Sequence, residues 1–591
     1  MLKTTPLERA LWVILLLLAT ALRLVGLGTA PLSLDEAVQA LAAYQTTHWG
    51  GIPPAARTIS PLLFHANVLL FALFRGGDGL ARLIPALCGV GLALTPLPLR
   101  RYLGRWGALG SGFLLALSPT LLALSRTLDG SIPAALGVML LVGAVTRFLD
   151  SWRSAWIPLG GVGLALALTA GPTAWGLLLG LALALAGGPW VWQEQVPWVW
   201  QEQVPWVWPM VRPALGRGLA ALALGLFAFG AGLGLHPAGL AATGAQFLRW
   251  LSPGAGHKIN LLIPVLASEP LLLVTGLAGA TLALSQRHGM GLLWLFWTLV
   301  GALWGIIRPA PAAPVLWLVP LAGLGGLAVE ALARALQSGA PGAHGWAYGA
   351  LSLTLWAHSG LVLTRYSRSA QPADLLLLSI GLALQMLLIL LFGAALSVPQ
   401  ENETPEEATR RALFFVLHRA ALVLGIVLLT VHFAAAWRVA TCPGEPSCAP
   451  GVAPAPTAPE LRLLAQEIPR VLDRIGARGD REYRLWLVDP DPAVAWTLRG
   501  LDFQIVPAER LHGEETPALI VAPTQVSVPE GYTGTTFTLR RAWLPPQYPY
   551  QWVRWVLFRE PSSPPPPTDP IALWVREDLI PVSSGPFSPR P

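Results

Sequence analysis

The apolar run LWVILLLLATALRLVGL, residues 11–27, decides the fold class of this chain. Its length approaches the roughly 20 residues with which an α-helix crosses the hydrocarbon core of a bilayer. It is longer than the apolar part of a signal peptide, and no small-residue cleavage site follows it. We therefore expect a retained membrane anchor at the N-terminal end.

Similar runs recur along most of the chain, which is 54% hydrophobic and only 12% charged. Soluble domains carry about a quarter charged residues, so the soluble globular classes are excluded. The sequence predicts a polytopic α-helical membrane protein. We count 14 apolar segments: 11–28, 60–75, 80–99, 106–124, 131–149, 155–170, 173–188, 213–233, 262–284, 290–307, 314–336, 346–365, 374–396 and 412–437.

The net charge of +7 has a membrane explanation, because arginine gathers at cytoplasmic loop edges in such proteins. The excess of positive charge is therefore no sign of a nucleic-acid partner, and we expect none. The arginines near positions 100, 147, 287 and 410 lie on one side with the N-terminus only if one early segment does not span. Segment 60–75 is the shortest candidate, either re-entrant or fused with the next helix. We predict about 13 transmembrane helices in a multi-pass cell-membrane protein with a cytoplasmic N-terminus.

After Arg438 the composition changes to that of an ordinary α/β domain. We expect a transmembrane domain over 1–438 and a small extracytoplasmic α/β domain over 439–591. YRLWLVD, DFQIV, ALIVAP, GTTFTLRRAW and IALWVRE read as strands, and ELRLLAQEIPRVLDRIGARG as a helix despite Pro469. Cys442 and Cys448 would close a small disulfide loop if this side is oxidising.

The stretch PLSLDEAVQALAAY, residues 31–44, holds two adjacent carboxylates at the predicted outer surface. Ser33 and Glu36 have the spacing of a capping box, and Asp35 would then complement the helix dipole. Alternatively, Asp35 is a general base that takes a proton from an acceptor hydroxyl. Both interpretations stay open, and they are compatible because the two carboxylates lie about 100° apart around a helix.

Arginines at the same predicted face could hold a phosphate leaving group, because the guanidinium fork binds phosphate in a bidentate manner. The candidates are Arg82, Arg126 and Arg308. Ordinary snorkelling at the interface is the alternative for each. No His, Asp and Glu residues have metal-ligand spacing, so no metal ligand is assigned, although a divalent cation is left open as a cofactor.

The order of several motifs resembles the GT-C superfamily of membrane glycosyltransferases, and within it the protein O-mannosyltransferase-like group (glycosyltransferase family 39-like). The carrying stretches are LRLVGLGTAPLSLDEA, SPLLFHANVLLFALFRGGDGLARLIPALCGV, LGRWGALGSGFLLALSPTLLALSRTLDGS and LALTAGPTAWGLLLG. LLIPVLASEPLLL, RPAPAAPVLWLVPLAGLGGLAVE, AVAWTLRGLDFQIV and GYTGTTFTLRRAWLP resemble its flippase-activity-associated subgroup of surface glycosylation.

The resemblance implies a helical bundle with an outer-face cavity and an extracytoplasmic domain. It puts Asp35 at the catalytic-base position with Glu36 beside it, and Arg82 and Arg126 near the lipid phosphate. Glu269 and Arg308 match polar positions that border the site. Asp129, displaced from the usual aspartate position, completes the expected substrate-binding set.

The expected function is inverting transfer of a hexose from a polyprenyl-phosphate donor to a hydroxyl of a glycan, lipid or protein acceptor. The alternative is a non-catalytic accessory that helps to flip or present lipid-linked glycans. That alternative is favoured by polar losses relative to the resemblance: Ala170 stands where lysine is common, and the turn SRTLDGS lacks a second arginine.

Overall fold

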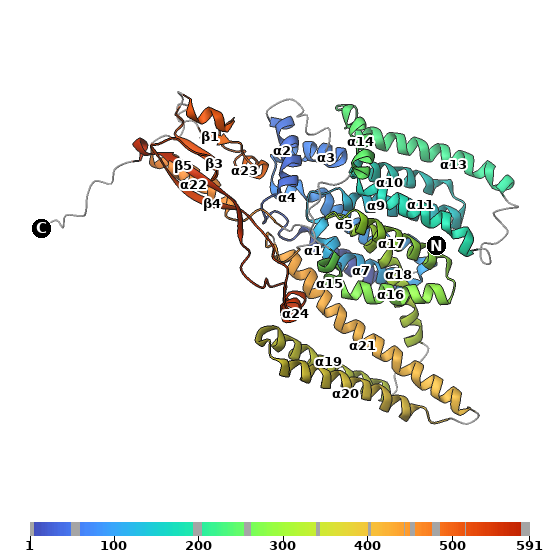
Figure 1. Cartoon of the computed structure of the whole chain (residues 1–591). Coiled ribbons are helices and arrows are strands. Elements are labelled where there is room, and N and C mark those ends of the chain that lie inside the picture. Colours follow the sequence, from blue (N-terminus) through green and yellow to red (C-terminus); the bar gives the residue numbers. More distant parts are fainter. Residues whose placement is uncertain are drawn as a thin grey trace.

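A computed structural model shows a long helical bundle with a small sheet at one end (Figure 1). The sheet lies at the end opposite the N-terminus. The structure describes residues 5–48, 60–192, 204–252, 262–337, 343–399, 403–442, 444–449, 455–475, 485–513 and 516–580.

The bundle follows the predicted apolar segments closely. Its helices are α1 (Pro6–Leu24), α2 (Leu34–His48), α3 (Pro61–Phe74), α4 (Asp78–Ala81), α5 (Leu83–Leu94), α6 (Arg100–Leu103), α7 (Arg105–Leu117), α8 (Pro119–Ser125), α9 (Ser131–Ser151), α10 (Ile157–Ala170), α11 (Thr173–Trp192), α13 (Val204–Gly225), α14 (Ala238–Leu251), α15 (Leu262–Ser268), α16 (Pro270–Ser285), α17 (Gly289–Ile307), α18 (Val315–Gln337), α19 (Ala343–Ser369), α20 (Pro372–Leu396) and α21 (Pro405–Thr441).

Seven helices in the described ranges are long and apolar enough to cross a membrane, or nine if each of two bent pairs forms one span. Three shorter apolar helices, α3 among them, accompany these. At about 1.5 Å per residue, α3 is shorter than the roughly 30 Å hydrocarbon core. Multiple apolar helices support a membrane protein, whereas the count of 13 crossings and the re-entrant path of segment 60–75 stay predictions.

Two segments that the sequence predicts as single spans are broken, and a proline lies at each break. α7 and α8 meet at 61°, and α15 and α16 meet at 86°. Each second helix begins with a proline, Pro119 or Pro270. Proline lacks the N–H that would continue the helix, and its ring pushes the preceding residue out of the helical region.

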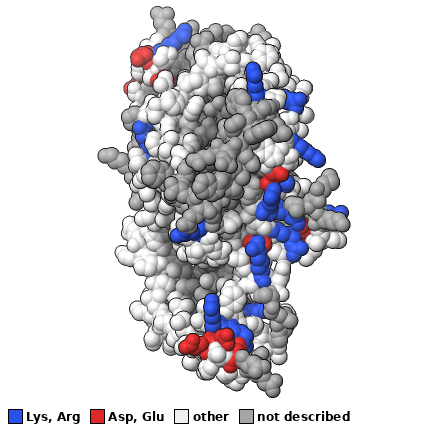
Figure 2. Space-filling model, turned by 90° about the vertical axis from the view of Figure 1, so that its right-hand side faces the viewer, with Lys and Arg blue, Asp and Glu red and all other residues white. Residues whose placement is uncertain are grey.

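Ion pairs tie the helices together at the end away from the sheet. Arg100 donates to Glu8 at the start of α1 (2.6 Å), and Arg101 donates to Asp150 near the end of α9 (2.8 Å). Figure 2 shows this end, with Lys and Arg at several places and fewer Asp and Glu. That this end is the cytoplasmic face stays a prediction from the positive-inside rule.

The C-terminal part forms a five-stranded sheet of order β2-β1-β3-β5-β4, in which β1 is parallel to β2 and β3 while β5 is antiparallel to β3 and β4. All five predicted strands are present. The predicted helix over residues 460–479 is present as Leu461–Arg474 with Pro469 inside it, and residues 476–479 lie outside the described residues. Its elements are α22 (Leu461–Arg474), β1 (Leu485–Val488), α23 (Pro492–Thr497), β2 (Gln504–Val506), β3 (Leu519–Pro523), β4 (Tyr532–Arg541), α24 (Pro549–Phe558) and β5 (Pro567–Arg576).

Asp78, at the start of α4, anchors the sheet domain to the bundle. Its carboxylate accepts hydrogen bonds from Trp496 Nε1 (2.7 Å) and Arg462 Nη2 (2.6 Å). Arg462 also donates to the carbonyls of Gly28 and Thr29 in the loop after α1 (both 2.7 Å). The domain is therefore fixed above the loop that leads into α2.

Candidate functional site

A cavity of about 310 Å³ opens beneath the sheet domain, at the end of the bundle opposite the ion pairs of Arg100 and Arg101. Segments far apart in sequence form its wall: the loop after α1, the first turn of α2, the turn between α8 and α9, and the end of α21. The chain brings Asp35, Glu36, Arg82, Arg126 and Asp129 into this wall.

Asp35 is the exposed carboxylate of the first turn of α2, and it lines the cavity. Within the described ranges, no hydrogen bond or ion pair engages its side chain. An acidic residue is favourable at this position, because the first turn of a helix carries partial positive charge. The helix start therefore suits the charge of Asp35 while its oxygens stay available to a ligand.

Glu36, by contrast, is buried and fully engaged. Its carboxylate accepts from the Ser33 N–H (2.9 Å), which is the Glu36 half of the predicted capping box. It also accepts from the Leu128 N–H (2.7 Å) and pairs with Arg82. Burial alone would raise the pKa of Glu36, but the charge and hydrogen bonds of Arg82, with those two N–H groups, bring it below its ordinary value.

All five N–H donors of Arg82 form hydrogen bonds with protein atoms. Nε and Nη2 hold Glu36 (2.7 and 2.8 Å), and the remaining hydrogen bonds reach the carbonyls of Leu27, Ala30 and Pro31. Arg82 therefore fixes the loop between α1 and α2 and so sets the position of the first turn of α2.

Arg126 forms hydrogen bonds with the ends of two helices, α1 and α21. Its guanidinium donates to the carbonyls of Leu22, Arg23 and Val25 at the end of α1, and of Ala440 at the end of α21 (2.8–3.1 Å). These are carbonyls that a helix end leaves without an internal partner. No carboxylate pairs with Arg126 in the described part of the chain, and burial lowers its pKa to about 10, with the charge of Arg82 acting in the same direction.

Arg23 adds a second buried cation that the sequence interpretation missed. It donates to the carbonyls of Leu115 and Ala116, both at 3.2 Å, and lies close enough to Arg126 for their charges to interact. An arginine inside the first apolar run was the available signal, since charges within such runs are rare and often functional.

Asp129 precedes α9 and accepts a hydrogen bond from the Ser131 N–H (2.8 Å). Burial raises its pKa, which the bonds from Ser131 offset only in part, and the charges of Glu36 and Asp35 add to the effect of burial. This carboxyl therefore takes up a proton more readily than a free aspartate does.

Glu269 and Arg308 do not line the cavity. Glu269, at the break between α15 and α16, is buried and accepts from Ser118 Oγ (2.7 Å) and the Thr120 N–H (2.9 Å) at the other break. It therefore ties the two broken helices together. Arg308 donates to the carbonyls of Leu251 and Ser252, although its neighbours Ala310–Ala312 reach the cavity wall.

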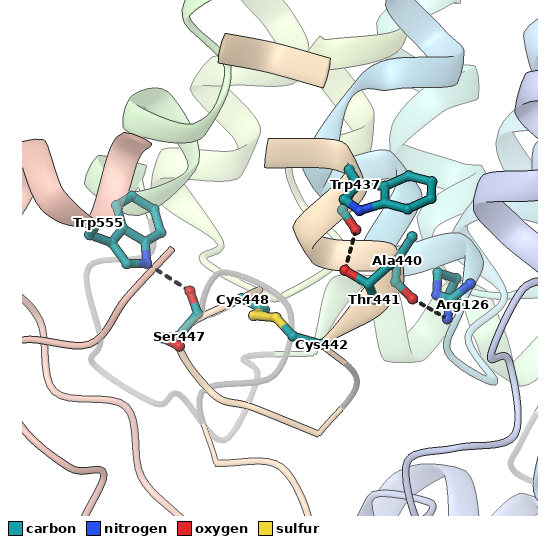
Figure 3. Close-up of a disulfide and its surroundings, with 8 residues drawn as sticks. All are labelled: Arg126, Trp437, Ala440, Thr441, Cys442, Ser447, Cys448 and Trp555. Atoms are coloured by element: carbon teal, nitrogen blue, oxygen red, sulfur yellow. Dashed lines mark hydrogen bonds between the residues drawn. A yellow bond between two sulfur atoms is a disulfide. The ribbon is translucent and has the colours of Figure 1, made fainter. Parts of the chain in front are cut away.

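The predicted disulfide between Cys442 and Cys448 is present and closes a loop beside the cavity (Figure 3). On one side of it, Arg126 holds Ala440; on the other, Trp555 Nε1 in α24 donates to the Ser447 carbonyl (2.7 Å). The loop therefore connects the end of α21 to the sheet domain.

The described residues contain no group of three or more His, Cys, Asp or Glu side chains that could hold a divalent cation. Glu36 is committed to Arg82, so Asp35 and Asp129 remain the carboxylates of the cavity wall that no arginine neutralises, apart from exposed Glu445.

Comparisons with known proteins give a similarity of fold. No protein-family model and no curated protein matches the sequence. The crystal structure of ArnT from Cupriavidus metallidurans bound to undecaprenyl phosphate matches with a TM-score of 0.51 and 14% identity, covering 98% of this chain and 99% of that one. The apo structure of the same protein gives 0.50 and 14% over the same coverage.

An Archaeoglobus fulgidus oligosaccharyltransferase tethered to an acceptor peptide matches less well, with a TM-score of 0.45, 12% identity and coverage of 88% of this chain and 69% of that one. The chain therefore shares the fold of ArnT over nearly its whole length.

Proposed function

We propose that this protein transfers a sugar from a polyprenyl-phosphate donor to a hydroxyl acceptor in the cavity beneath the sheet domain, with Asp35 as the general base. The observation that carries the proposal is an exposed carboxylate without a protein partner in the described ranges, in a cavity that also holds a cation without a carboxylate partner. ArnT, which shares the fold, has been crystallised with undecaprenyl phosphate.

The buried cations supply the electrostatics that the reaction needs. Arg126 lines the cavity, and Arg23 lies behind it. The positive charge favours an anion directly beside Arg126, although the same wall also holds Asp35, Asp129 and Glu445. A charge fixed in place before the reaction stabilises charge as it develops on a leaving phosphate. Arg82 has no free donor, so we assign it as the residue that positions the loop before Asp35.

The chemical step is a single displacement. Asp35 takes the proton of the acceptor hydroxyl as its oxygen forms a bond to the anomeric carbon. The bond from that carbon to the phosphate oxygen breaks, and its electron pair leaves with the polyprenyl phosphate. The configuration at the anomeric carbon is inverted, because attack and departure occur on opposite faces.

Three finer assignments belong to the same proposal. The protein would resemble the O-mannosyltransferase-like group in its donor, it would take a hexose, and its acceptor would be a glycan, lipid or protein. The cavity and the sheet domain would face the outside of the cell membrane. The arginine-rich opposite end supports this orientation through the positive-inside rule.

The accessory role remains a second candidate because one observation favours it. All the donors of Arg82 and most of those of Arg126 are bound to protein atoms, so little guanidinium capacity is left for a phosphate. Such a cavity could hold a lipid-linked glycan without transferring it.

A transfer assay with radiolabelled polyprenyl-phosphate hexoses separates the two candidates. General-base catalysis contributes roughly 10²–10⁴-fold, so Asp35→Asn should lower the transfer rate by about that factor. Ser33→Ala is the matched control, because it changes the same helix start without removing the base. An accessory would show no turnover in either variant or in the wild-type protein.

A further inference from the structure

The sheet domain contains a second cavity, of about 300 Å³, that the proposed reaction does not use. It lies where β1 and β3 end: Val488, Asp489 and Asp491 come from the first strand end, and Ala522, Pro523 and Gln525 from the second. The volume is at the small end of the roughly 300–1,000 Å³ of ligand pockets, which suits one or two sugar rings.

The topology of the sheet explains why a crevice forms there. From β1 the chain passes through α23 to β2 on one side, and then crosses to β3 on the other side of β1. Loops that leave neighbouring parallel strands in opposite directions open a gap at the carboxyl ends of these strands. In open α/β sheets, this switch point is where ligands bind.

The chemistry of the wall selects the ligand. Buried Val521, Leu539 and Ile571 form apolar parts of it, while Asp489, Asp491, Asp569 and Gln525 supply oxygen acceptors. Arg540 is the cation of this cavity wall, and it already bridges Asp491 and Asp569. Excess negative charge repels phosphate groups, whereas carboxylates accept hydrogen bonds from hydroxyls.

Two of the eight non-glycine residues with positive φ in the described part of the chain lie at the same place. Asp489 and Asp569 are non-glycine residues with φ values of 40° and 52°, in the left-handed region. Residues in this region are uncommon and tend to occur where function needs them. Both of these residues lie in the wall of one cavity, although 80 positions separate them in the sequence.

The two cavities share a wall. Pro456 and Thr457 line the cavity of Asp35, whereas Leu539 and Arg540 line the second one. Between them, Thr457 forms an antiparallel bridge with Arg540, and the Ala458 N–H donates to the Leu539 carbonyl (2.8 Å). Two paired segments, residues 456–458 and the end of β4, therefore separate the two sites.

We propose that the second cavity is a subsite for a neutral saccharide, with its hydroxyls on the aspartates and its C–H face on the apolar wall. The saccharide would be a further unit of a glycan whose end reaches Asp35. This last assignment, as part of the acceptor, rests on the proposed function, whereas the binding site itself does not.

The test is saturation-transfer NMR on the full chain in nanodiscs, with the methyl glycosides of glucose, mannose and galactose as probes. Glucose 1-phosphate and ethanolamine are the anionic and cationic comparisons. At least one glycoside should bind, and the double variant Asp489→Asn/Asp569→Asn should weaken its affinity at least fivefold. Asparagine tolerates a positive φ, so both positions keep their backbone.

Gln525→Leu, on the exposed rim, should weaken binding too, while Asp578→Asn is the matched control outside the cavity and should leave it unchanged. Equal binding in all variants, no glycoside binding, or binding of only the charged probes would each overturn the subsite. Asp35→Asn should keep glycoside binding. If the wild-type protein binds glycosides as expected but transfers no sugar, the proposed function fails and the subsite stands.

Discussion

Removing the charge of Glu36 should destabilise the protein far more than its single-atom change suggests. In the Glu36→Gln variant, the amide oxygen could still accept two hydrogen bonds, but the amide NH₂ group would face two donors among Ser33, Leu128 and Arg82. Arg82 would be left buried and uncompensated. Breaking a buried ion pair on one side costs about 3–5 kcal/mol, so Glu36→Gln should cost that much.

The assay is the loss of folded protein on heating and in denaturant, measured for detergent-solubilised wild-type and variant chains. Arg101→Met is the matched control, because its pair with Asp150 is exposed on the arginine side (63%) and should contribute about 0–1 kcal/mol. The double variant Glu36→Gln/Arg82→Met should be less destabilised than the sum of its single variants, since no buried charge remains unpaired. If Glu36→Gln stays within about 0.5 kcal/mol of wild type, the assignment of the pair as the fixed support of Asp35 is wrong.

Three further outcomes follow from the same part of the molecule. Replacing Cys442 and Cys448 by serine opens a short loop and should lower stability by about 2 kcal/mol, read as a melting shift that vanishes when wild type is reduced. Burial raises the pKa of Asp129 in the folded protein above its ordinary value of 3.8. Above the folded-state pKa the buried carboxyl is ionised, which lowers stability. Below the unfolded-state pKa the carboxyl is protonated in both states, so this cost disappears. Asp129→Asn should therefore melt higher than wild type near about pH 8, and this gain should shrink towards about pH 4. A Cβ at Gly130 would collide with the Ala170 carbonyl, so Gly130→Ala should lower the melting temperature, whereas Gly216→Ala, which meets open space, should not.

Much of the fold was predictable because its signals are local. Apolar runs located the bundle helices, alternation located all five strands, and Cys442 and Cys448 were near enough in sequence to suggest their disulfide. The prolines at positions 119 and 270 were a local signal for the two breaks. The apolar run continues on both sides of each proline, so the sequence predicts each run as one span. Whether such a run bends depends on the neighbours that satisfy the freed backbone groups, such as Glu269, whose carboxylate accepts from the Thr120 N–H after the break at Pro119.

The sequence by itself determined a membrane-embedded helical chain with a separate α/β end, because hydrophobicity, strand alternation and proline act over a few residues at a time. Only the tertiary structure separated the roles of Asp35 and Glu36, which are adjacent in the chain. Arg82, 46 positions away in sequence, engages the carboxylate of Glu36, and no local pattern encodes such a partner. The tertiary structure also brings Arg23 close to Arg126, with no carboxylate paired to either in the described ranges. It separates the cavity of Asp35 from the sheet cavity by two paired segments, residues 456–458 and the end of β4. Burial and charge pairing belong to the assembled molecule, and they decide which of several carboxylates stays exposed and without a partner in the described ranges.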